Sequence, residues 1–211
     1  MAQSTTGING IFSGRIGNVV FYEMNGKQVA RQLPSGKMPA ATGPKKVAQE
    51  NFGRVIRIMK GIRQYVNTGF KDVETRGSAF RQAVSVNLKR LGASSHPDSL
   101  EWLLPTMGTR AGAHDITMQQ ADQMATVSWG APHEDKPYLN RDLVMLLAIN
   151  ATTLENTGDL SATRSQQQCT FRMPRAKEGE KVLVFLSFYD PMAAATRKNS
   201  DNVSEAQLVI P

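Results

Sequence analysis

The chain has 211 residues, of which 40% are hydrophobic and 20% are charged, and its net charge is +7. This composition is sufficient for a packed core in one large or two small domains, and the single cysteine, Cys169, excludes an intrachain disulfide. The charge is uneven, because residues 1–95 carry 15 Lys or Arg against 4 acidic residues, whereas residues 96–211 carry 10 against 14. A basic N-terminal part and a mildly acidic C-terminal part indicate two regions that contact different partners.

The first residues, MAQSTTGINGIFSGRIG, lack the charged start and apolar run of a secretion signal. No stretch approaches the roughly 18 uninterrupted apolar residues that a membrane span requires. We therefore expect a cytoplasmic protein without a membrane span, or a part of a particle that is released without a signal peptide.

Residues 1–18 are punctuated by glycines and are expected to form a loop. The runs NVVFYEM and KQVARQL then flank Asn25-Gly26, which is a strong signal for a tight β-hairpin turn. In that register Val20, Tyr22, Met24 and Val29 share one face. Because a lone hairpin is marginally stable in water, we expect it to pack on another element, in the first place the helices. The same face is a candidate interaction surface.

After a linker over residues 34–44, the sequence predicts a helix to about Asn67 and a second helix that begins near Ser78 and ends before Gly92. The apolar stripe of the first helix is expected to comprise Ala48, Phe52, Val55, Met59, Ile62 and Val66. The opposite face is cationic and is a candidate polyanion-binding face: Lys45, Lys46, Arg54, Arg57, Lys60 and Arg63.

Residues 93–113 form a connecting passage whose Leu100, Trp102, Leu103 and Leu104 are expected to enter the core. From residue 115 onward, short alternating runs separated by turn residues predict a β-sandwich. Trp129, at the end of MATVSW, is similar to the core tryptophan of fibronectin type III modules. The predicted fold class is α+β: a hairpin and two helices over 1–113, followed by a fibronectin- or Ig-like sandwich over 114–211.

The whole chain resembles an uncharacterised bacterial domain-of-unknown-function family. The resemblance rests on SGRIGNVVFY, ATGPKKVAQENF, YVNTGFK, FRQAVSVNLKRL, HPDSLEWLL and ATVSW in that order. It implies a glycine-rich hairpin, a helical middle and an Ig-like or fibronectin-like end. It implies no activity, substrate or catalytic residue.

No motif indicates catalysis, a metal or a cofactor. His96, His114 and His133 lack ligand-type spacing, and Cys169 lies in a strand-like run where nothing would lower its pKa. The carboxylate pairs Glu134-Asp135 and Glu178 with Glu180 lie in polar, turn-like surroundings. Gly14-Arg15-Ile16-Gly17 matches the GXXG loop of KH domains, but that loop joins two helices, whereas a strand is expected here.

We therefore expect a non-enzymatic structural or protein–protein interaction module, with no small-molecule substrate. It would be a component of a larger assembly such as a particle, a phage or a surface-associated structure, and self-assembly is one expectation. The alternative is a protein that binds nucleic acid or another polyanion without sequence specificity through the basic helix face. With Tyr65 as the one aromatic residue beside that face, base stacking is not expected.

Overall fold

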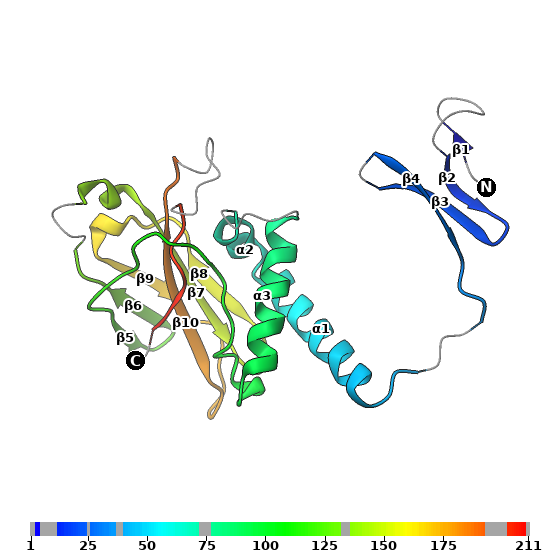
Figure 1. Ribbon diagram of the computed structural model, residues 1–211. Helices are drawn as coiled ribbons and strands as arrows, with labels where there is room; N and C mark the ends of the chain where they lie inside the picture. Colours follow the sequence, from blue (N-terminus) through cyan, green and yellow to red (C-terminus); the bar gives the residue numbers. More distant parts are fainter. Residues whose placement is uncertain are drawn as a thin grey trace. The chain divides into compact units, whose positions relative to one another are not determined.

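The computed structural model describes residues 3–4, 12–24, 26–36, 40–71, 77–131, 136–192 and 202–209. Across these residues the fold is α+β, with three α-helices and three antiparallel sheets (Figure 1). Contacts divide the chain into a first unit, Met1–Thr42, and a second unit, Gly43–Pro211. Each unit is described by itself.

The first unit contains one sheet of strand order β1-β2-β3-β4. Its strands are β1 Gln3–Ser4, β2 Phe12–Ile16, β3 Val19–Met24 and β4 Lys27–Gln32. Met24 pairs with Lys27 across the predicted turn, in which Gly26 has a φ of +74° and Asn25 lies outside the described residues. The expectation of a loop over residues 1–18 is wrong for Gln3–Ser4 and Phe12–Ile16, because β1 pairs with β2, and Gly14, Arg15 and Ile16 of β2 pair with β3.

The helices of the second unit are α1 Gly43–Gly61, α2 Arg63–Gly69 and α3 Ala79–Ala93. The first predicted helix is therefore divided at Ile62, next to Gly61, which is a poor helix former. The second begins as predicted, since the Ser78 hydroxyl accepts a hydrogen bond from the Arg81 amide at 3.4 Å. Within the described residues, no helix combines the length and the apolar character needed to cross a bilayer.

The strands of the second unit form two sheets, of order β5-β6-β9 and β11-β10-β7-β8. They are β5 Thr117–Ala121, β6 Met124–Ser128, β7 Leu143–Asn150, β8 Asn156–Asp159, β9 Gln168–Arg172, β10 Val182–Tyr189 and β11 Gln207–Val209. Gly158 and Asp159 are residue types typical of turns, but both belong to β8, which pairs with β7. A Cβ at Gly158 would meet the carbonyl of Leu146 on β7 and the hydroxyl of Tyr65 on α2, so glycine allows both to lie close to this strand.

The sheet that contains β7 and β10 lies between two hydrophobic layers, because its strands are buried on both faces. Alternate residues on one face join the helices in a first core, which we call the helix core: Met145, Leu147, Ile149, Leu183 and Phe185. Their neighbours on the other face pack against β6 and β9 in a second core, the sandwich core: Val144, Leu146, Ala148, Val184 and Leu186. Trp129 belongs to the sandwich core and contacts Phe188 edge-on at 5.8 Å.

This arrangement differs from the boundary that the sequence placed between residues 113 and 114. The helix core joins α1, α2, α3 and the passage containing Leu100, Trp102 and Leu103 to the face of β7 and β10. Helices and sheets therefore share one interior, and the division of contacts lies at Thr42 instead. No described residue of the linker before Gly43 belongs to either core.

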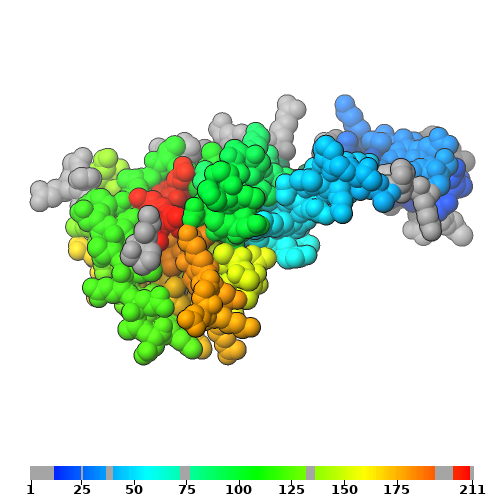
Figure 2. Space-filling view, turned by 90° about the horizontal axis from the view of Figure 1, so that it is seen from below, coloured from blue at the N-terminus to red at the C-terminus, as the bar shows by residue number. Residues whose placement is uncertain are grey.

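The predicted stripe on α1 and α2 is buried only in its second half. Val55, Met59, Ile62 and Val66 are inaccessible to solvent, whereas Phe52 is 50% exposed and Ala48 is also exposed. The expectation that these two residues enter the core is wrong, because the first turns of α1 project from the rest of the second unit (Figure 2).

This difference predicts unequal effects of truncating two large side chains on the same stripe. We expect Met59→Ala to lower the free energy of unfolding by about 2–5 kcal/mol, because it leaves a cavity in the helix core. Phe52→Ala is the matched control and should change it by less than about 1 kcal/mol. Urea denaturation followed by circular dichroism measures both, and equal losses would contradict the placement of Phe52.

Candidate interaction surfaces and buried polar sites

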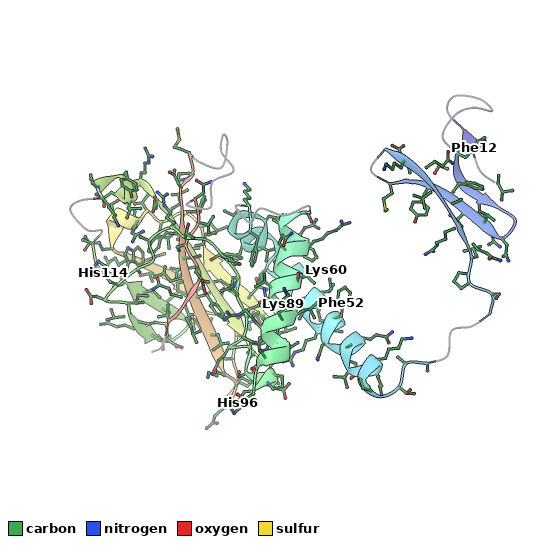
Figure 3. All side chains as sticks on the ribbon, in the orientation of Figure 1. Phe12, Phe52, Lys60, Lys89, His96 and His114 are labelled. Atoms are coloured by element: carbon green, nitrogen blue, oxygen red, sulfur yellow. The ribbon has the colours of Figure 1, made fainter. Side chains whose placement is uncertain are left out.

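The candidate polyanion-binding face lies on the side of α1 and α2 away from the helix core. Lys45, Lys46, Arg57, Lys60 and Arg63 are exposed. Lys60 of α1 and Lys89 of the neighbouring α3 are labelled in Figure 3, and α3 thus adds an exposed cation to the helical layer. Most of the predicted cations are therefore exposed to solvent on the layer formed by the helices.

Arg54 and Arg63 also hold the helices against their neighbours. Arg54 donates a hydrogen bond to Asp98 at 3.0 Å, and its guanidinium lies 6.0 Å from the ring centre of Trp102. Arg63 lies 5.7 Å from the ring centre of Phe80 on α3. These contacts place Arg54 at the flank of the cationic face and reduce its availability to a ligand.

The candidate interaction hairpin of the first unit has the face that the sequence predicted. The register sets Tyr22 directly opposite Val29, and Val20 and Met24 follow at alternate positions of β3. Met24 is 54% exposed, and the other three side chains are only half-buried. The face is therefore open to solvent and combines these apolar side chains with two cations of β4, Lys27 and Arg31.

The opposite face of the same sheet was not predicted from the sequence. Phe12 and Phe21 lie on it with ring centres 6.4 Å apart. The Gln28 side chain crosses to β2, where its amide donates to the Phe12 carbonyl at 3.0 Å and its oxygen accepts from the Phe12 amide at 3.2 Å. The alternation in FSGRI is the signal that could have revealed this face.

Four charged side chains form a buried ion cluster in the second unit: Arg110, Asp142, Arg164 and Asp190. Arg110 binds both carboxylate oxygens of Asp142, at 2.5 and 2.7 Å. Arg164 donates to the carbonyls of Ala111 and Gly112, and its guanidinium lies 4.3 Å from the ring centre of Phe188. The cluster fastens the passage before β5 to the sandwich, so its role is structural.

The thiol of Cys169 is buried beside a carboxylate. Its Sγ donates a hydrogen bond to Asp159 Oδ2 at 3.1 Å, and burial together with this carboxylate raises the pKa of Cys169 to about 12. An open hollow beside it is lined by polar residues such as Ser161, Gln166 and Thr170, with no histidine among the described residues that line it. The thiol is therefore protonated at neutral pH and is a poor nucleophile.

The remaining titratable candidates are not brought together. His96 and His114 lie at separate places in the second unit (Figure 3), and His133 with Glu134-Asp135 lies outside the described residues. Hydrogen bonds with Asp115 and with the Ala131 carbonyl raise the pKa of His114. A hydrogen bond from the Lys177 amide and one from Asn150 lower the pKa of Glu180, which is the reverse of what a general acid requires.

A metal site likewise does not emerge from the part of the chain that the structure describes. Within those ranges, no three His, Cys, Asp or Glu residues are grouped so that they could hold a metal ion. Among the described residues, the features that stand out are thus surfaces: the cationic helical layer, the exposed start of α1 and the two open faces of the first sheet.

These features define a two-unit α+β protein whose larger unit combines helices with two facing antiparallel sheets. The chain belongs to a family of unknown function, DUF6266, whose family model matches residues 11–201. This agrees with the resemblance noted in the sequence. A search of curated proteins gives no match.

Two solved structures are similar to part of the chain. The fibronectin type III domain of the human collagen alpha-1(XX) chain is 18% identical with a TM-score of 0.33, and the match covers 47% of this chain and 81% of that one. A myokine structure is 12% identical with a TM-score of 0.30, and the match covers 47% of this chain and 95% of that one. Both TM-scores are too low to define the fold, which rests on the strand order described above.

The ion cluster predicts a large effect for the loss of a single carboxylate. We expect Asp142→Ala to lower the free energy of unfolding by about 3–5 kcal/mol, because two buried guanidinium groups lose their shared partner. Asp98→Ala removes the exposed partner of Arg54 and should cost less than about 1 kcal/mol. Chemical denaturation of both variants tests this, and a small loss for Asp142→Ala would show that the cluster is dispensable.

The environment of Cys169 predicts a slow reaction with a thiol reagent. At neutral pH the folded protein should react with 5,5′-dithiobis(2-nitrobenzoic acid) at least about 100-fold more slowly than the denatured protein. Asp159→Asn should accelerate the reaction, because removal of the negative charge lowers the pKa of the thiol. Glu155→Gln, on the exposed turn before β8, is the control and should leave the rate unchanged. A rapid reaction of the folded wild-type chain would refute the assignment.

Proposed function

We propose that the protein is a non-enzymatic interaction module that joins a larger assembly through the sheet of its first unit. The observation that carries the proposal is the lack of a core in this unit. None of its described residues, 12–24, 26–36 and 40–42, is buried. The sheet nevertheless carries aromatic and aliphatic side chains on both faces, and Ile16 and Met24 are more than half exposed, at 56% and 54%.

A sheet of this kind gains stability when a partner covers it. Isolated strands need a packed apolar face or a helix against them to be stable in water. Open apolar surface on a soluble protein commonly marks a site of protein association. Both considerations support attachment to another protein as the function of the first unit.

We further propose that the second unit is a fibronectin type III or Ig-like sandwich to which a helical layer has been added. The support is its pair of facing sheets, β5-β6-β9 and β11-β10-β7-β8, with a buried tryptophan at the end of β6. Domains of this class often act as scaffold or adhesion units, although that comparison is an analogy of fold. In this proposal the second unit is the body of the module, and the first unit is its means of attachment.

A second candidate function is nonspecific binding of nucleic acid by the cationic helical layer. The observation that favours it is the exposure of Lys46, Arg57 and Lys60 on α1, opposite the helix core. Such binding would weaken steeply with rising salt, because it depends on the release of counterions from phosphates.

Light scattering after gel filtration separates the two candidates. The full chain is measured at low and high salt, with and without double-stranded DNA. It is compared with Tyr22→Asp, which places a charge on the hairpin face, and with a charge-reversal variant that combines Lys46→Glu, Arg57→Glu and Lys60→Glu. We expect a mass above that of the monomer, unaffected by DNA, retained in the charge-reversal variant and reduced in Tyr22→Asp.

Hydrogen exchange on the same samples gives an independent measure of whether the first sheet needs a partner. Amides of β3 and β4 should exchange much faster in the dissociated chain than those of β7, which is buried on both faces. A monomer whose β3 and β4 amides are as protected as those of β7 would refute the proposal. A monomer that shifts with DNA at low salt, and loses the shift on charge reversal, would favour the second candidate.

A further inference from the structure

The exposed edge of β4 has backbone groups arranged for a further strand. The tight hairpin joins Met24 to Lys27, so the residues of β4 that bond to β3 recur at every second position from Lys27. The hydrogen bond from the Leu33 amide to the Asn18 carbonyl, at 2.8 Å, fits this alternation. The amide and carbonyl groups of Gln28, Ala30 and Gln32 therefore point away from β3, where the described residues supply no neighbouring strand.

This edge has few of the features that normally prevent strands from pairing. From Gln28 to Leu33 it contains no proline, and the residues with outward backbone groups are uncharged. Its two cations, Lys27 and Arg31, lie at alternate positions with Val29 between them, on the same face as Tyr22. Whether this edge can pair with an identical edge therefore depends on which residues of the second strand lie opposite these two cations.

We infer that β4 pairs antiparallel with β4 of a second copy of the chain, with Ala30 at the two-fold axis. This inference rests on the proposed function and identifies the partner of the first sheet as a second copy of the chain. In this register Gln28 lies opposite the partner's Gln32, Val29 opposite the partner's Arg31, and Lys27 opposite the partner's Leu33. No like charges lie directly opposite, and shifting the register by two residues in either direction shortens the overlap.

The same register continues the apolar face of the hairpin across the axis. Val29 lies beside Tyr22 within one copy and diagonally across from the partner's Val29, within contact range for neighbouring strands. Through this diagonal pair the apolar side chains of Tyr22 and Val29 extend from one copy to the other, with Arg31 of each copy directly opposite Val29 of the other. A two-fold contact of this kind uses both edges at once and closes on itself, so it produces a dimer and not a fibre.

Cysteine pairs test the register in the full-length chain. The background is Cys169→Ser, in which a hydroxyl can still donate to Asp159. Ala30→Cys should form a disulfide-linked dimer on mild oxidation with diamide, because residue 30 meets its own copy at the axis. Gln28→Cys and Gln32→Cys alone should stay monomeric, because each lies about 14 Å from its counterpart. Mixing these two variants should restore the cross-link.

Ala30→Pro supplies a second, independent variant. The amide it removes points away from β3, so proline there is tolerated within the hairpin but blocks pairing with the partner strand. We expect this variant to be monomeric by light scattering, with the circular dichroism spectrum of the wild type.

The outcomes separate this inference from the proposed function. If all three single cysteines cross-link equally, or if none does while Tyr22→Asp still disrupts a multimer, β4 pairing is wrong but attachment through the first sheet stands. If the chain is monomeric and its first sheet is fully protected from exchange, both fail.

Discussion

The structure of the second unit depends on the burial of β7 and β10 on both faces. Successive residues such as Leu146 and Leu147 point into different cores, one shared with β6 and β9 and the other with the helices. Because side chains alternate with a strict period of two, a slip of one residue would exchange every contact between the two layers. Met145, Leu147 and Ile149 belong to the helix core, whereas Val144, Leu146 and Ala148 belong to the sandwich core.

The sequence predicted most elements but not how they combine. The hairpin, the start of α3 and six strands of the second unit follow from local turn and alternation signals, as at Asn25-Gly26 and Ser78. The boundary at residue 113 followed from treating helices and strands as separate cores. The uninterrupted apolar runs LVMLLAIN and VLVFLSFY contain the missing information, since a strand with one wet face would alternate.

The candidate surfaces were predicted less completely than the elements. Periodicity placed Phe52 on the apolar side of α1 correctly, but it could not reveal that this turn of the helix is exposed. The face shared by Val20, Tyr22, Met24 and Val29 follows from pairing alone. Which cations contact aromatic rings, as Arg63 does with Phe80, depends on residues distant in the sequence and could not be foreseen from it.

The shared sheet has a consequence for how the protein loses its structure on heating. Because the helical layer and the second sheet both use β7 and β10, neither can melt without exposing the other's interior. Residues 43–211 should therefore behave as one cooperative block with a single calorimetric transition. The sheet before Thr42, which contributes to neither core, falls outside that transition and can be gained or lost without disturbing it.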